Sequence, residues 1–234
     1  QKARDLKLKE FSIIAPSSSL IEPISAVSQI VEGCKMSLYK FDKYKSKKEN
    51  NVPNLTILIS RSEKILKTIK IAEIVSEGSI YTKSIANLPP NECMPETLAN
   101  FANIISKKND MKCNIISKIE LKKKGFGGIV AVGQGSKNEP KLIILEHNRG
   151  RRNEKPIVLV GKAVTFDTGG ISLKPGEKMD EMKFDKCGGC TVIGIMKAVS
   201  ELKLPINLVG IIPSVENMPG GGSYRPGDII KLYN

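Results

Sequence analysis

The sequence predicts an α/β protein, in which a small N-terminal α/β domain precedes a larger α/β/α domain with a mostly parallel central sheet. Three observations support this prediction. Strand-like apolar runs alternate with segments of helical periodicity, which is the pattern of a layered α/β fold. The run at residues 157–160 is continuously apolar, as in strands that a parallel sheet buries on both faces. The chain is 40% apolar and 26% charged, an ordinary composition for a globular protein with a core.

Residues 1–62 are predicted to form a partial N-terminal α/β domain. Two short apolar runs, at residues 11–15 and 55–59, indicate strands. Between them, the lysine- and asparagine-rich residues 43–54 are predicted to be turn or loop, because polar residues of this kind favour turns.

Residues 63–88 are predicted to form a helix that connects the two domains. Within this segment Ile65, Ile69 and Ala72 recur at helical spacing. The helix should end before Pro89, because a proline restricts the backbone of the residue that precedes it.

Residues 89–234 are predicted to form the second domain. Its first helix should begin near Pro95, because proline suits the first turn of a helix. The apolar stripe of this helix is predicted to be Leu98, Phe101, Ile104 and Ile105. Strands are predicted at residues 113–116, 129–132, 141–145, 157–160 and 206–212, and helices at residues 119–124 and 191–202.

The charge balance raises the question of a nucleic-acid partner. The chain holds 37 basic and 24 acidic residues, a net charge of +13, but this excess is spread along the sequence. Aromatic residues make up 5% of the chain and tryptophan is absent, so platforms for base stacking are scarce. We find neither a secretory signal nor the run of about 20 apolar residues that a membrane-spanning helix needs. These features predict a cytoplasmic protein with no membrane partner and disfavour nucleic acid as its main ligand.

The five cysteines are predicted to be reduced thiols, because their number is odd and no secretory signal precedes them. Cys187-Gly188-Gly189-Cys190 has the spacing of a metal or redox motif, but it stands without a second pair of cysteines. We therefore interpret it as the small-residue start of a tightly packed helix. The single histidine, His147, is predicted to lie at the surface or at a strand end.

The densest group of chemically useful residues lies between positions 160 and 190. Lys162 directly follows a predicted strand, in the crevice where α/β folds place their ligands. Asp167 precedes two glycines that let the backbone approach another group closely, and Lys174 and Asp185 follow. Two lysines and two carboxylates fit a structural ion-pair network or a metal site, and composition and spacing leave both open.

The motifs in this region carry a resemblance to a known family. The segments VGKAVTFDTGGISLKP (residues 160–175), MKFD (182–185) and ENMPGGGSYRPGD (216–228) resemble motifs of the cytosolic leucyl aminopeptidases. Weaker similarity extends to NLPPNECMPETLANFA (87–102) and AVGQGS (131–136). Members of this family are dinuclear metallopeptidases that remove N-terminal residues from peptides.

The resemblance implies a role for five residues. Lys162, Asp167 and Asp185 correspond to metal ligands, and Lys174 corresponds to the catalytic lysine. Met182 falls where the family lines the pocket for the first side chain of the substrate, although methionine is also ordinary core filler. Aspartate oxygens suit Zn²⁺, Mn²⁺ or Mg²⁺. A lysine can be a ligand only as the neutral amine, because an ammonium group has no lone pair.

The resemblance also implies what the rest of the site would need. In the family, a later NTDAEGRL motif supplies two more carboxylate ligands and an arginine that anchors bicarbonate. This sequence ends before that motif, so both domains are predicted to be incomplete and the 234-residue chain itself inactive.

The predicted function is that of a metal-dependent aminopeptidase that releases N-terminal amino acids from short peptides through a metal-bridged water. The resemblance implies two divalent ions as cofactors, Zn²⁺ or Mn²⁺ with Mg²⁺ as a third candidate, and a homohexamer as the assembly. The alternative hypothesis is a basic DNA-binding or scaffold protein that keeps the aminopeptidase fold.

Overall fold

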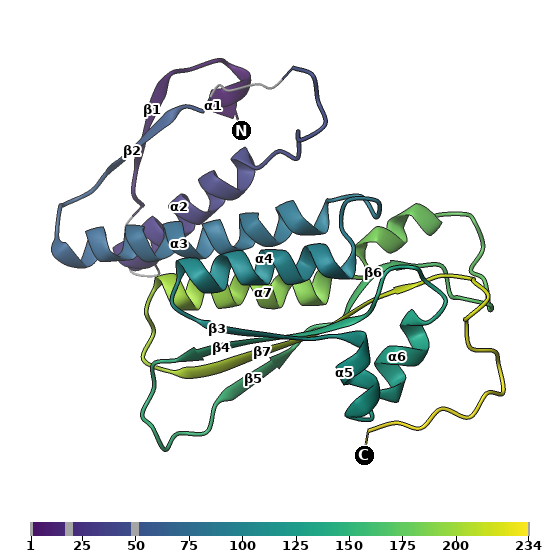
Figure 1. Ribbon diagram of the computed structural model, residues 1–234. Coiled ribbons are helices and arrows are strands. Elements are labelled where there is room, and N and C mark those ends of the chain that lie inside the picture. The colour runs from purple at the N-terminus through teal and green to yellow at the C-terminus, as the bar shows by residue number, and fades with distance from the viewer. Residues whose placement is uncertain (1, 17–20, 48–51, 234) are drawn as a thin grey trace. The chain divides into compact units, whose positions relative to one another are not determined.

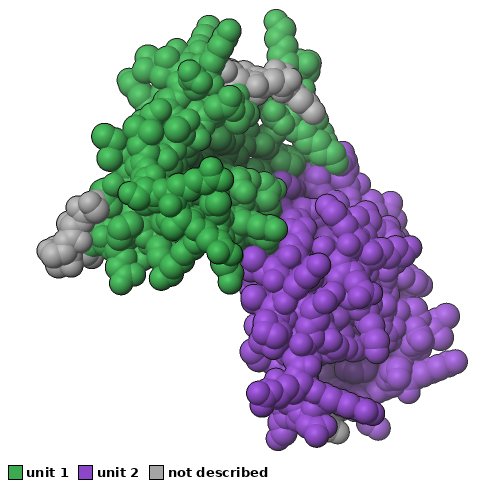
Figure 2. Space-filling view, turned by 90° about the vertical axis from the view of Figure 1, so that its left-hand side faces the viewer, with its two compact units in different colours: residues 1–80 green, residues 81–234 purple. Residues whose placement is uncertain are grey.

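The computed structural model describes residues 2–16, 21–47 and 52–233. The chain divides into two compact units, residues 1–80 and residues 81–234 (Figure 2). The boundary falls within a long helix, α3 (Glu63–Ala86). Helices and strands alternate along the chain, so the predicted α/β class is confirmed (Figure 1).

The first unit begins with the short helix α1 (Lys2–Asp5) and contains two parallel strands. Strand β1 (Glu10–Ile14) pairs with β2 (Asn54–Leu58), and Phe11 lies opposite Leu55. Both strands were predicted within one residue of these bounds. The predicted loop at residues 43–54 includes residues 48–51, which lie outside the described part of the chain.

Helix α2 (Pro23–Leu38) connects the two strands of the first unit and was not predicted from the sequence. Pro23 occupies its first turn, where a missing backbone N–H costs nothing. The helix contributes Val27 and Val31 to a small core that also contains Ile65 and Ala72 of α3. Parallel strands need a long crossover connection, and α2 is part of that crossover, so this unit has a βαβ arrangement.

In the second unit, the central sheet has the strand order β3-β4-β7-β5, with β6 also paired to β7. The strands are β3 (Lys112–Ile116), β4 (Lys141–Asn148), β5 (Ile157–Val160), β6 (Ala163–Asp167) and β7 (Asn207–Asn217). The pairs β3–β4 and β4–β7 are antiparallel, whereas β5 and β6 run parallel to β7. The sheet is mixed, but β3, β5, β6 and β7 point the same way and only β4 of the described strands runs against them, so the predicted mostly parallel sheet is confirmed with β4 as its exception. Residues 149–156 connect β4 to β5 without a helix, and parallel strands need a longer crossover than that.

Helices cover both faces of this sheet. On one face, α4 (Pro95–Lys108) and α7 (Cys187–Glu201) lie side by side (Figure 1). On the other, α5 (Lys118–Lys123) and α6 (Gly127–Gly133) pack with a cluster that includes Ile211. The next residue, Ile212, faces Gly189 of α7, and neighbouring residues of a strand point to opposite faces. The result is the predicted three-layer α/β/α arrangement.

Helix α4 begins at Pro95, as predicted, but its buried face differs from the predicted stripe. Leu98 and Ile105 are buried as expected, whereas Ile104 is 59% exposed. Ala99 and Ala102 take its place in the core, because small side chains let the helix approach its neighbours closely.

The predicted strand at residues 129–132 is wrong, since these residues form helix α6. A run of four apolar residues is compatible with either a strand or a buried helix turn. Here Ile129 and Val130 pack on a core cluster of Ile116, Leu121 and Leu142, which fixes the helix against the sheet.

The predicted burial of residues 157–160 is also wrong. These residues form β5 as expected, but Ile157, Val158 and Val160 are 55%, 50% and 69% exposed. Strand β5 stands at the end of the described sheet, so only β7 borders it.

His147 lies near the end of β4, as one of the two predicted positions had it, but it is buried, so the predicted surface position is wrong. Its Nε2 atom lies 2.9 Å from the carbonyl oxygen of Leu204, which gives it a structural role.

The CxxC sequence opens α7 and its cysteines are free thiols, which agrees with the small-residue interpretation. A Cβ atom at Gly189 would lie 2.6 Å from that of Ala163, so a glycine is required where α7 crosses β6. Within the described ranges, no helix is both long and apolar enough to cross a bilayer.

Candidate functional site

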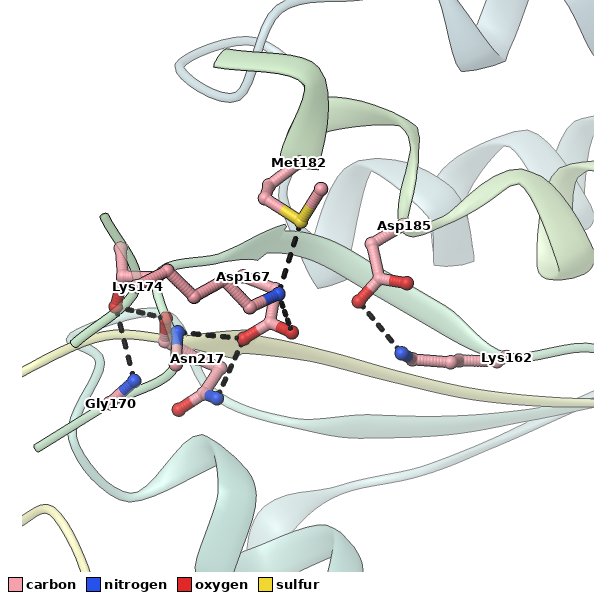
Figure 3. A network of polar contacts seen from close by, with 9 residues as sticks. Lys162, Asp167, Gly170, Lys174, Met182, Asp185 and Asn217 are labelled. Carbon is pink, nitrogen blue, oxygen red and sulfur yellow. Dashed lines mark hydrogen bonds and ion pairs between the residues drawn. The ribbon is translucent and has the colours of Figure 1, made fainter. Parts of the chain in front are cut away.

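The five residues singled out from the sequence all lie around strand β6 in the second unit (Figure 3). Lys162 immediately precedes β6, and Asp167 is its last residue. Lys174 belongs to the loop that follows. Met182 lies in a 3₁₀ helix, η1 (Met179–Phe184), and Asp185 lies between η1 and α7. The structure thus arranges the side chains as two lysine–aspartate pairs, one at each end of β6.

The first pair joins Lys174 to Asp167. The Nζ atom of Lys174 donates to Oδ2 of Asp167 at 2.7 Å. The same Nζ lies 3.0 Å from the sulfur of Met182. The Asp167 side chain is 15% exposed and that of Lys174 is 36% exposed, so the pair is shielded but open on one side. The predicted catalytic lysine and the predicted pocket residue are therefore in contact.

The other oxygen of Asp167 is bound by the protein itself. Its Oδ1 atom accepts hydrogen bonds from the backbone N–H of Gly169 at 2.9 Å and from Nδ2 of Asn217 at 2.7 Å. Burial raises the pKa of Asp167, but the hydrogen bonds from Lys174, Gly169 and Asn217 outweigh burial and lower the pKa below its ordinary value. The carboxylate is therefore held in its ionised form.

The loop after Asp167 turns back because Gly169 and Gly170 take positive φ angles of 88° and 74°. Thr168 anchors the turn, donating from its backbone N–H and its hydroxyl to the carbonyl oxygen of Asn217 at 3.0 and 2.9 Å. The backbone N–H of Lys174 then donates to the carbonyl oxygen of Thr168 at 2.9 Å. This closed loop is what brings Lys174 back to Asp167.

The second pair joins Lys162 to Asp185. The Nζ atom of Lys162 lies 2.8 Å from Oδ2 of Asp185, which makes an ion pair by distance. This buried Oδ2 accepts no hydrogen bond from the described residues. Lys162 is 62% exposed and Asp185 is 22% exposed. The carbonyl oxygen of Asp185 accepts from the N–H of Val164 at 3.2 Å, which ties this residue to β6.

Two residues near the site were not given a role from the sequence. Asn217 contacts Asp167, as described above. Lys186, which follows Asp185, is fully buried, and its Nζ donates to the carbonyl oxygens of Leu88, at 3.0 Å, and of Lys183. Burial lowers the pKa of Lys186. Its position next to Asp185 in the MKFDK sequence was the only signal that could have singled it out.

The side chains present fit part of a metal site. Asp167 and Asp185 offer hard oxygen donors, and the unsatisfied Oδ2 of Asp185 is an acceptor available to a cation. In the part of the chain that the structure describes, no three residues among His, Cys, Asp and Glu gather closely enough to hold a metal ion. A complete site would therefore need the amine of Lys162 as a ligand and further donors.

The second unit has the fold of a peptidase catalytic domain. Residues 80–234 match the model described as the cytosol aminopeptidase family, catalytic domain. The chain belongs to the cytosol aminopeptidase family.

Several curated relatives support this assignment. A probable cytosol aminopeptidase of Cenarchaeum symbiosum is 56% identical over 234 residues, which is 100% of this chain and 47% of the relative. Probable cytosol aminopeptidases of Methylobacillus flagellatus and Roseiflexus castenholzii are 43% and 39% identical, over 87% and 100% of this chain. The chain spans about half the length of the curated relatives it matches.

A solved structure has the same fold. The bottromycin maturation enzyme BotP, in complex with Mn, superposes with a TM-score of 0.87 and 25% sequence identity. The alignment covers 98% of this chain and 49% of that one.

Proposed function

We propose that this chain is part of a metal-dependent aminopeptidase that releases N-terminal amino acids, of the leucyl type, from short peptides. The observation that carries the proposal is the ion pair between the buried Oδ2 of Asp185 and Lys162, at one end of the strand that ends in Asp167. This oxygen accepts no hydrogen bond from the described residues, so it can accept a further ligand. A divalent cation is the ligand that fits a carboxylate and an amine.

Lys162, Asp167 and Asp185 would hold the metal in this proposal. Two ions, Zn²⁺ or Mn²⁺ with Mg²⁺ as a third candidate, fit these donors, and the related BotP was solved in complex with Mn. When bound, such ions supply Lewis acidity and a bridging water that is activated near neutral pH. The ligands still missing would come from residues beyond Asn234, where the family carries two more carboxylates and the arginine that anchors bicarbonate.

Lys174 is the proposed catalytic residue. Asp167 holds the Nζ atom of Lys174 at 2.7 Å on the open side of the pair. From there the ammonium group can donate to the carbonyl oxygen of a substrate as negative charge develops on it, as an oxyanion donor does. Met182, whose sulfur lies 3.0 Å from the same Nζ, would line the pocket for the first side chain of the substrate.

The remaining parts of the proposal concern the whole protein. Cytoplasmic location and assembly as a homohexamer follow from the family resemblance, and the relatives carry the name cytosol aminopeptidase. The alternative of a DNA-binding or scaffold protein gains no support, because the relatives reported above are named as aminopeptidases and no observation favours that alternative.

Hydrolysis of an aminoacyl amide tests the proposal. A full-length protein of the relatives' length should release the amine only when Mn²⁺, Zn²⁺ or Mg²⁺ is added, and chelation should remove the activity. Residues 1–234 alone should stay at background under the same conditions, because the described residues supply too few ligands for two ions. Absence of turnover in the full-length protein with all three metals, or metal-dependent turnover by residues 1–234, would contradict it.

A further inference from the structure

We propose that Asn217 is a positioning residue, which fixes the carboxylate of Asp167 so that one oxygen is held by the protein and the other remains turned toward Lys174. The inference rests on the proposed function in one respect: Asp167 is taken as a metal ligand. It assigns to Asn217 a role that acts through Asp167 and not through direct contact with the substrate.

The hydrogen bonds of Asp167 divide between its two oxygens (Figure 3). Oδ1 accepts from Nδ2 of Asn217 at 2.7 Å and from the N–H of Gly169 at 2.9 Å. Oδ2 accepts from Lys174 at 2.7 Å. Two neutral N–H donors therefore saturate the inner oxygen, and the outer oxygen stays available on the side where the lysine reaches it. Rotation of the carboxylate would break both inner hydrogen bonds at once.

The backbone of Asn217 is itself fixed relative to Asp167. The two residues are opposite partners in the pairing of β6 with β7. The carbonyl oxygen of Asn217 also accepts the two hydrogen bonds from Thr168, at 3.0 and 2.9 Å. The amide group therefore has a short, rigid connection to the strand that ends in Asp167, as a positioning residue requires.

The amide group of Asn217 lies against Gly170, which leaves it room. A Cβ atom at Gly170 would lie 2.9 Å from Oδ1 of Asn217, so the glycine provides the space that the amide oxygen occupies. The amide nitrogen must be the atom that faces Asp167, because an ionised carboxylate only accepts hydrogen bonds. The Nδ2 atom of Asn217 is thus the donor in this hydrogen bond, and asparagine provides it without adding a charge next to the proposed metal.

The size of the expected effect follows from metal sites in general. Residues that hydrogen-bond a metal ligand typically change metal affinity or activity by 10- to 100-fold when they are removed. We therefore expect Asn217→Ala to weaken Mn²⁺ binding by about 10- to 100-fold in the full-length protein. Asn217→Ser should act in the same direction, because its side chain is too short to replace the amide, and it serves as the second variant if the alanine variant folds poorly.

A matched control lies on the same strand. Asn207 begins β7 and makes three hydrogen bonds through its side chain, to Gly150, Arg151 and Glu154, away from the site. Asn207→Ala should lower thermal stability while leaving the dissociation constant for Mn²⁺ unchanged. This separates loss of position at Asp167 from a general loss of stability in β7.

The experiment measures Mn²⁺ affinity by competition with a chelating dye, and the crystal structure of the metal-free Asn217→Ala protein. Weaker Mn²⁺ binding together with a rotated Asp167 carboxylate on an unchanged Thr168–Gly170 backbone supports the proposal. An Asp167 carboxylate that keeps its orientation in the variant overturns it, and so does an unchanged affinity. If the unaltered protein binds no metal, the proposed function fails, and the orientation of Asp167 still decides the role of Asn217.

Discussion

The two lysine–aspartate pairs of the site have nearly equal ion-pair distances and very different surroundings. Lys174 lies 2.7 Å from Asp167 and Lys162 lies 2.8 Å from Asp185. Asp167 accepts three hydrogen bonds, one of them from Lys174, whereas the Oδ2 atom of Asp185 makes none with the described residues. Judged by their ion-pair distances alone, the two pairs would be equivalent.

The difference in hydrogen bonding indicates that the protein has already oriented the carboxylate of Asp167, whereas that of Asp185 is left open to a ligand. Asp167 is saturated by donors from β7 and from its own loop, so its geometry is set before anything binds. The buried Oδ2 atom of Asp185 is paired with Lys162 but accepts no hydrogen bond from the described residues, so it is free to accept a ligand. The comparison therefore predicts different consequences for the members of each pair.

The largest expected effect concerns the two aspartates. In the full-length protein, Asp167→Ala and Asp185→Ala should each abolish turnover of an aminoacyl amide and lower the amount of bound metal, because each removes an oxygen donor. Metal analysis of the purified variants and a turnover assay are the measurements. If either variant kept both its metal and its turnover, the proposed role of that aspartate would be wrong, and the contrast between the pairs would have no functional meaning.

The second prediction separates the lysines. Lys162→Ala should weaken metal binding, because the proposed ligand is its neutral amine. Lys174→Ala should keep the metal and lose about 10²- to 10³-fold in turnover, as removal of one oxyanion donor does. Metal stoichiometry and turnover of both variants give the answer. Equal metal loss in both, or in neither, would mean that the lysines only balance neighbouring charge.

The sequence was sufficient to predict those parts of the site that depend on local spacing. Four site residues lie close together in the chain around β6, so the motif that contains them largely determines their relative positions. They are Lys162, Asp167, Lys174 and Asp185. Asn217 was missed because its contact with Asp167 arises from the pairing of β6 with β7. Nothing in an asparagine at a strand end distinguishes it until that pairing is known.

The errors in the fold have a similar origin. Whether Ile129–Val132 becomes a strand or a helix turn depends on contacts with residues of β3, β4 and α5, which periodicity over four residues cannot reveal. Strand β5 was correctly located, but its exposure depends on its place at the end of the described sheet. The direction of β4 depends on its connections and pairing partners, which composition does not encode.

The third prediction concerns Met182, whose sulfur lies 3.0 Å from the lysine of the first pair. Met182→Ala should enlarge the proposed pocket and change the ratio of kcat/KM between leucyl and alanyl substrates by about 10-fold, since one or two methylene groups in an apolar pocket have effects of that size. Met179→Ala, in the same 3₁₀ helix, is the matched control and should leave the ratio unchanged. If the kcat/KM ratio were unaltered in Met182→Ala, Met182 would not line the pocket for the first side chain of the substrate.

The smallest expected effect is on the pH dependence of folding, and it isolates the hydrogen-bonded pair. The pKa of Asp167 is lowered in the folded protein because hydrogen bonds from Lys174, Gly169 and Asn217 outweigh the opposing effect of burial. A carboxyl group with a lowered pKa stabilises the fold above its unfolded value of about 3.9, and this contribution is lost as the pH falls through the folded value.

Lys174→Met removes one of the contacts that lower the pKa of Asp167, so it should reduce stability at neutral pH. The deficit relative to the unaltered protein should then shrink as the pH falls below about 4, because protonation of Asp167 removes the interaction from both proteins. Urea unfolding of the metal-free proteins between neutral pH and pH 3 measures this deficit. The control is Lys141→Met, whose partner Glu96 lies at 2.9 Å with a side chain 62% exposed, so its deficit should stay small at every pH. A deficit for Lys174→Met that did not change with pH would show that Lys174 acts through packing and not through its charge on Asp167.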